Sequence, residues 1–84
     1  MKTAIKKGDI VESKAGHDAG RIYVVAGVME GKYLSLVDCE YRWLGNPKKK
    51  KESHVRFLSG AVLPEKIKDT DIRMILKTYK ESKK

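Results

Sequence analysis

Polar and apolar residues alternate along much of the chain up to residue 58, which is the pattern of half-buried β-strands. The segment 21–29 is rich in β-branched residues and is apolar on both faces, because Tyr23 and Val25 oppose apolar even-numbered positions. A strand of that kind is expected at the centre of a small closed sheet. The same pattern predicts further strands over residues 9–13, 33–39, 40–44 and 54–58.

The period of the pattern changes near the C-terminus. Four apolar residues recur there at helical spacing: Ile72, Ile75, Leu76 and Tyr79. They predict an amphipathic helix over residues 70–82, with Asp69 or Thr70 as its N-cap. An isolated helix of this length is marginal, so its apolar stripe needs a sheet to pack on. We therefore expect one mainly β domain over residues 1–84, with a small SH3-like β-barrel at about 6–60 and a C-terminal amphipathic α-helix.

The chain is strongly basic. Its 84 residues carry 19 lysine and arginine side chains against 11 aspartate and glutamate side chains, which gives a net charge of +8. The positive excess lies in the second half of the chain and is densest at the four consecutive lysines 48–51. This charge balance predicts attraction to polyanions, whatever the fold.

Cysteine content and hydropathy predict the compartment. Cys39 is the only cysteine, so no disulfide can form within the chain and a reducing compartment is expected. The basic N-terminal residues are followed by Gly8-Asp9 instead of an apolar run, so no signal peptide is expected. Because no apolar run approaches the length of a membrane span, we expect a cytoplasmic protein without a membrane partner.

A glycine-containing loop is predicted between the first two strands. Gly16 and Gly20 stand four residues apart, and glycine adopts a positive φ without a steric penalty. A loop without side chains at these positions also lets a phosphate backbone approach closely. Lys14 and Arg21 flank the loop and are placed to reach the same phosphates, and His17 lies within it.

Residues 8–21, which read Gly-Asp, then alternating apolar positions, then the glycine loop and a strand, resemble the KOW motif. The resemblance extends over about residues 5–80, through Val37-Asp38, Arg42, the lysine run, His54 and the start of the helix. Over this range the chain is similar to bacterial KOW-domain RNA-binding proteins and to KOW-type large-subunit ribosomal proteins of archaea and eukaryotes. This resemblance implies an SH3-like barrel that binds RNA, with ribosomal RNA and ribosomal proteins as the expected partners.

The lysine run is the largest electrostatic feature, and two interpretations of it stay open. It follows Pro47 and returns to His54, so a loop here is tethered at both ends and suits a phosphate clamp. The alternative is a solvated loop that only aids solubility. With the resemblance, the candidate RNA-binding residues are Lys14, Gly16, His17, Gly20, Arg21, Arg42, Lys48, Lys49, Lys50, Lys51 and His54.

Aromatic residues flank Arg42. Tyr41 and Trp43 share one face of any strand here and Arg42 takes the other. Unstacked RNA bases can stack on such groups, but Trp43 is large enough to be expected in the core of a small barrel. Arg42 is therefore the expected RNA contact of the three.

Catalytic and metal-binding classes have no supporting pattern. A zinc site needs paired ligands such as Cys-x-x-Cys, and His17-Asp18, Cys39 and His54 are not spaced in that way. We therefore expect a monomeric protein that is not an enzyme and needs no cofactor. The alternative function is an SH3-like protein-interaction module of the transcription or translation machinery, which would use exposed aromatic residues such as Tyr23 or Trp43.

Overall fold

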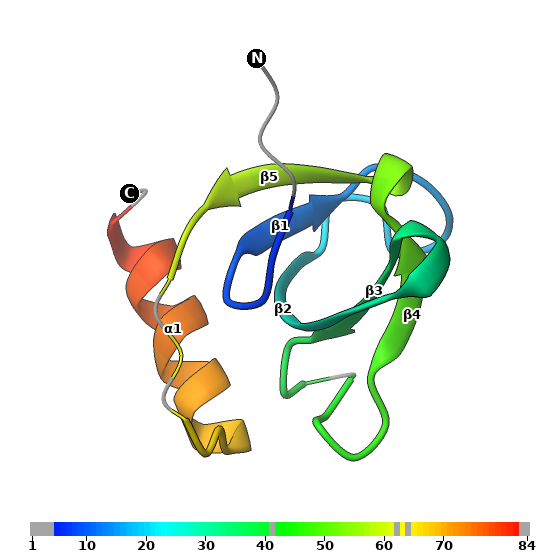
Figure 1. The fold of residues 1–84 in the computed structure, drawn as a ribbon. Coiled ribbons are helices and arrows are strands. Elements are labelled where there is room, and N and C mark those ends of the chain that lie inside the picture. The colour runs from blue at the N-terminus through cyan, green and yellow to red at the C-terminus, as the bar shows by residue number, and fades with distance from the viewer. Residues whose placement is uncertain (1–4, 41, 62, 64, 83–84) are drawn as a thin grey trace.

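Five strands and one long helix make up the structure, a computed structural model that describes residues 5–40, 42–61, 63 and 65–82 (Figure 1). The strands are β1 Ile10–Ser13, β2 Ile22–Met29, β3 Tyr33–Val37, β4 Lys48–Lys51 and β5 Val55–Ser59. Short 3-10 helices, η1 Glu30–Lys32 and η2 Glu52–His54, join β2 to β3 and β4 to β5, and α1 spans Asp69–Ser82. The predicted mainly β class with a C-terminal helix is confirmed.

The strands form one antiparallel sheet in the order β4-β3-β2-β1-β5. The central strand is β2, as its two apolar faces predict, and Tyr23, Val24 and Val25 are buried in it. The ladder does not close into a barrel, because β4 and β5 remain its two edges among the described strands. In Figure 1 the sheet is curved, and the chain passes between its edges through η2.

Each face of the sheet carries its own apolar cluster. One consists of Ile5, Val11, Tyr23, Val25, Leu34, Leu36 and Val55. The other consists of Ile10, Val24, Val37 and Cys39 from the sheet side, with Ile72 and Leu76 from α1. Ile75 and Tyr79 pack at its margin, so the predicted helix stripe is confirmed as core. With 14 residues, α1 is too short to cross a membrane, and no other helix in the described ranges could do so.

The predicted strand over residues 40–44 is wrong. Oδ1 of Asp38 accepts hydrogen bonds from the backbone N–H groups of Glu40, at 3.0 Å, and Arg42, at 2.8 Å. A side chain that accepts from its own following backbone offers an alternative to a sheet ladder, so the chain turns here. Cys39 takes a positive φ of 57° within this turn, and only an isolated bridge joins Trp43 to Asn46.

The lysine run was expected as a loop and is instead the edge strand β4. It pairs with β3 in a continuous register from Leu36 opposite Lys48 to Tyr33 opposite Lys51. An edge strand with one side unpaired is commonly protected by lysine, because the charge opposes pairing with another chain. The four lysines therefore have fixed and alternating directions.

The expected N-cap also differs. Asp69 is the first residue of α1, and its Oδ1 accepts from the Leu44 backbone N–H at 3.0 Å and from Cys39 Sγ at 3.2 Å. At the helix start the N–H of Lys68 donates to Asp71 Oδ2 at 3.0 Å. Asp69 thus holds the turn after β3 against the helix and is not a cap for the helix itself.

Candidate nucleic-acid interface

Residues 14–20 form the glycine loop between β1 and β2. Gly16 and Gly20 have φ values of 85° and 93°, so both adopt the left-handed conformation that glycine tolerates best. The N–H of Gly20 donates to the carbonyl of Ser13 at 2.8 Å, which closes the loop at its base. An added Cβ at Gly20 would meet no atom within 4 Å, so the conformation and not crowding calls for glycine there.

Asp18 is a buried acid at the centre of the glycine loop. Its Oδ1 accepts from Ser13 Oγ at 2.9 Å, and its Oδ2 accepts from the Tyr23 hydroxyl at 2.9 Å. Two lysines of β4 complete its surroundings, with Lys50 Nζ 2.9 Å from Oδ1 and Lys48 Nζ 3.4 Å from Oδ2. A carboxylate with only 8% of its side chain exposed is thereby fully partnered.

The charge state of this cluster follows from its partners. Burial alone raises the pKa of Asp18, but hydrogen bonds from Lys50, Ser13 and Tyr23, and the charge of Lys48, outweigh it. The pKa of Asp18 is therefore held well below its ordinary value, and the carboxylate is ionised at neutral pH. Burial and the hydrogen bond to Asp18 raise the pKa of Tyr23 to about 12, so its hydroxyl remains a donor.

The lysines of β4 divide into two pairs. Lys48 and Lys50 lie opposite Leu36 and Leu34 in the ladder, so they point to the interior face and reach Asp18. Only 10% of the Lys50 side chain is exposed. Lys49 and Lys51 project to the other face and are exposed.

The exposed pair has an aromatic neighbour. Lys49 Nζ lies 4.7 Å from the centre of the Tyr33 ring, a cation–π contact on β3. Because Lys49 and Lys51 are exposed whereas Lys48 and Lys50 face Asp18, Lys49 and Lys51 are the lysines of this run available to a phosphate.

Two segments that are distant in sequence lie side by side at this edge. Lys50 Nζ donates to the carbonyl of Ala15 at 2.9 Å, and the N–H of Lys14 donates to the carbonyl of His54 at 2.9 Å. These bonds join the glycine loop to β4 and η2. We call the exposed side chains of the two segments the loop–strand surface, which consists of Lys14, His17, Lys49, Lys51 and His54.

The two candidate arginines lie elsewhere. Arg21 is half-buried where the loop enters β2, and it lines a hollow of about 150 Å³ with Glu40 and with Lys80 of α1. Arg42 is half-buried in the turn after β3, where its carbonyl accepts from the N–H groups of Asp38 and Cys39. Sequence reasoning placed Arg21 with Lys14 at the glycine loop and Arg42 near the lysine run, whereas in the structure Arg21 also lines the hollow with Lys80 of α1 and Arg42 lies in the turn after β3.

The aromatic expectations change too. Trp43 has 43% of its surface exposed, so its expected place in the core is wrong. Tyr23 is 1% exposed and donates to Asp18, which removes it as an exposed docking residue. Tyr41 lies outside the described residues.

Asp18 is the residue that sequence reasoning missed. It was weighed only as a neighbour of His17, yet it makes its ion pair with Lys50, 32 residues away. No local pattern signals such a contact, because it depends on the register of β4. In the described part of the chain, no group of three His, Cys, Asp or Glu side chains is arranged to hold a metal ion.

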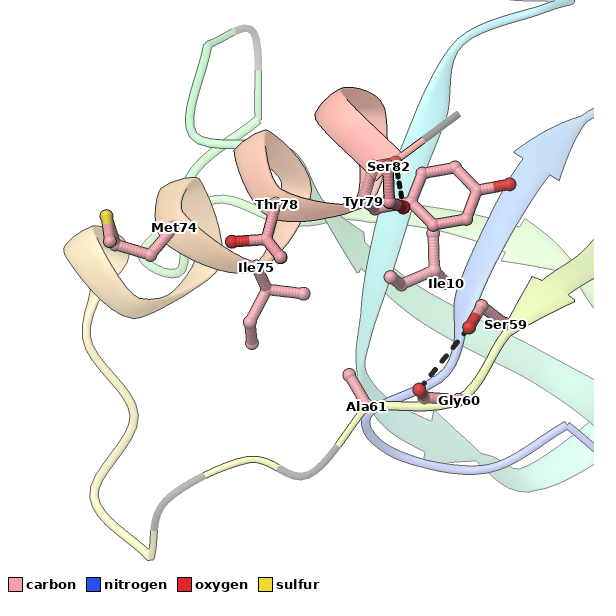
Figure 2. A pocket seen from close by; sticks show the side chains of 9 residues that line it. All are labelled: Ile10, Ser59, Gly60, Ala61, Met74, Ile75, Thr78, Tyr79 and Ser82. Atoms are coloured by element: carbon pink, nitrogen blue, oxygen red, sulfur yellow. Dashed lines mark hydrogen bonds between the residues drawn. The ribbon is translucent and has the colours of Figure 1, made fainter. Parts of the chain in front are cut away.

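A separate hollow of about 430 Å³ lies between α1 and the end of β5 (Figure 2). It is lined by Ile10, Ser59, Gly60, Ala61, Met74, Ile75, Thr78, Tyr79 and Ser82. None of these side chains carries a charge at neutral pH, so this hollow has no cation for a phosphate.

Comparison with known proteins gives no assignment: no protein-family model matches the chain, and no curated protein is significantly similar to it.

Proposed function

We propose that this protein is a small, non-catalytic RNA-binding protein whose loop–strand surface contacts RNA phosphates. The observation that carries the proposal is the junction of the glycine loop with β4, made by the bond from Lys50 Nζ to the Ala15 carbonyl. Beside it the N–H of Lys14 donates to the carbonyl of His54, so exposed Lys14 adjoins η2, the segment that follows exposed Lys51, on a chain of net charge +8. Contacts of this kind position a protein on RNA by shape and charge and carry little sequence information.

The resemblance of residues 8–21 to the KOW motif supports the same function. On that basis the curved sheet is of the SH3-like KOW type, with an open seam between β4 and β5. Ribosomal RNA is the proposed ligand, with ribosomal proteins as neighbours and the cytoplasm as the compartment. The protein acts as a monomer in this proposal.

Salt-dependent binding to a structured RNA fragment tests the proposal. Each neutralised phosphate releases counterions and contributes about 0.7 to 0.9 to the slope of log affinity against log salt. Three lysine contacts from the loop–strand surface therefore give a slope of about −2 to −3. From 50 to 200 mM salt, the affinity is then expected to fall about twentyfold to fortyfold.

The decisive variant is K14Q/K49Q/K51Q, with K66Q/K68Q/K77Q as its matched control. Each removes three exposed lysines and lowers the net charge from +8 to +5. We expect the first variant to lose nearly all salt-dependent binding and the control to keep most of it. Equal losses in both variants would show that overall charge and not this surface binds RNA, and a wild-type protein without RNA affinity would refute the function.

An exposed tryptophan favours a second candidate, the protein-interaction module. Trp43 is 43% exposed and Phe57 on β5 is 52% exposed, and aromatic residues are enriched in protein interfaces. A pull-down from nuclease-treated lysate with wild type and W43A separates the two functions. Partners that persist without RNA and are lost with W43A would favour protein docking.

A further inference from the structure

We infer that Asp18, an acidic residue, is a positioning residue for RNA binding, because it locks the glycine loop onto β4 through the two lysines that face inward. The inference deepens the proposed function and rests on it. A simple charge argument predicts the opposite, since an acid near the binding surface should repel RNA. The contacts around Asp18 decide between the two.

Asp18 does not face the RNA side. Only 6% of its surface is exposed, and both carboxylate oxygens are occupied by the donors of Ser13, Tyr23 and Lys50. Its charge is largely balanced by the ammonium groups of Lys50 and Lys48. The repulsion that RNA would feel from this carboxylate is therefore small, and removing it gains little.

The carboxylate instead fixes the geometry of the loop. Lys50 Nζ bridges Asp18 Oδ1 and the Ala15 carbonyl, so one ammonium ties both the side chain and the backbone of the loop to β4. Gly16 lies against the same pair, since a Cβ there would sit 3.6 Å from Asp18 Oδ1 and 3.7 Å from Lys50 Nζ. A loop held in this way presents Lys14 and His17 without further ordering when RNA binds.

Asp18 is the counter-charge of the two lysines that face inward. The register of β4 against β3 places Lys48 and Lys50 on the interior face, where they meet Asp18, and sends Lys49 and Lys51 outward. Without Asp18 the inward lysines lose their counter-charge and the loop loses its tie. RNA binding must then order the loop at that moment, at a cost that lowers affinity.

The first test compares D18N with E65Q. Each removes one acidic charge and raises the net charge from +8 to +9, and Glu65 is exposed in the segment before α1. We expect D18N to bind RNA about tenfold more weakly than wild type, since ordering the backbone of a single residue has a cost of that size. The salt slope of D18N should also become shallower, while E65Q keeps the wild-type slope and affinity.

A second pair of variants, Y23F and Y79F, leaves the net charge unchanged. It keeps the inference testable if D18N does not fold. Y23F removes the hydroxyl that donates to Asp18, and a residue that is 1% exposed cannot itself contact RNA. Y79F is the control, because it removes a tyrosine hydroxyl from α1. The expected loss is about fivefold for Y23F, the weight of one hydrogen bond, and none for Y79F.

Amide hydrogen exchange of the free protein gives a readout that does not depend on RNA. The N–H of Gly20 donates to the Ser13 carbonyl, and its exchange should accelerate in D18N and Y23F but not in E65Q or Y79F. Wild-type protein without RNA affinity would refute the proposed function. If wild type binds RNA but Y23F binds it as tightly as Y79F, or folded D18N as tightly as E65Q, the positioning role of Asp18 is refuted.

Discussion

The alternation of lysines along β4 makes a prediction that separates stability from RNA binding within one four-residue run. Two double variants, K49Q/K51Q and K48Q/K50Q, each lower the net charge from +8 to +6. A solvated lysine loop would respond in the same way to both. The strand predicts different responses, because one pair is exposed and the other pair faces Asp18.

The exposed pair should affect binding alone. Each phosphate contact contributes about 0.7 to 0.9 logarithmic units of affinity per tenfold change in salt. Loss of two contacts should therefore weaken RNA binding about 25-fold to 60-fold at 0.1 M salt, if the contacts contribute nothing at 1 M salt. The salt slope should fall by about 1.4 to 1.8. Stability should change by less than about 1 kcal/mol, because Lys49 contributes only an exposed cation–π contact with Tyr33.

The inward pair should affect stability. K48Q/K50Q leaves the Asp18 carboxylate with Ser13 and Tyr23 as its remaining hydrogen-bond donors. Removing the partners of a buried charge costs about 3 kcal/mol, to which Lys48 contributes less because 28% of its side chain is exposed. For a domain of this size that corresponds to a fall in Tm of about 12–24 °C.

Urea denaturation followed by circular dichroism and RNA filter binding at several salt concentrations measure the two effects. RNA affinity of K48Q/K50Q is also expected to fall, since the glycine loop loses its tie, so stability is the discriminating measurement. Equal destabilisation by K49Q/K51Q and K48Q/K50Q would contradict the division of β4 into an exposed and an inward pair. An unchanged salt slope for folded, RNA-binding K49Q/K51Q would show that this exposed pair does not contact phosphates.

Three further predictions concern the acid, the thiol and the core. The pKa of Asp18 is lower in the folded protein than its value of 3.8 in the unfolded chain, so the ionised carboxylate stabilises the fold fully above pH 3.8 and progressively less as the pH falls below it. A plot of Tm against pH should show this loss for wild type and not for D18N. Burial and the hydrogen bond to Asp69 raise the pKa of Cys39 to about 12, so a thiol reagent at pH 8 should modify the unfolded chain but not the folded one. Leu76→Ala should lower the free energy of unfolding by about 2–5 kcal/mol in urea titrations, because Leu76 joins α1 to the sheet; a loss below 1 kcal/mol would contradict that packing.

The elements that sequence reasoning predicted are those whose signal is local. The two apolar faces around Tyr23 and Val25 identify β2 as central, since the apolar residue at each position predicts a buried side chain. The helix stripe at Ile72 and Leu76 is equally explicit at helical spacing. In both cases the hydrophobic effect acts on a periodic pattern that is complete within about ten residues.

The parts that it missed depend on contacts between distant residues. The expected strand over residues 40–44 is displaced by a turn, because Asp38 captures backbone donors locally and Asp69 captures the N–H of Leu44 from 25 residues away. Four identical lysines cannot reveal a strand, because alternation is visible only where residues differ. The register that separates them comes from β3.

This register also limits what the net charge implies for the interface. Two of the four lysines in the densest basic run face a single buried acid, so only the other two are exposed on β4. Lys14 in the glycine loop supplies an additional cation, and its place beside His54 is set by a backbone hydrogen bond and not by attraction between charges. If the protein binds RNA as proposed, phosphate contacts on this surface are therefore few and fixed in position. Affinity should then depend more on the geometry of the loop than on total charge, which is why an acid-to-amide change at Asp18 is expected to weaken a polyanion complex.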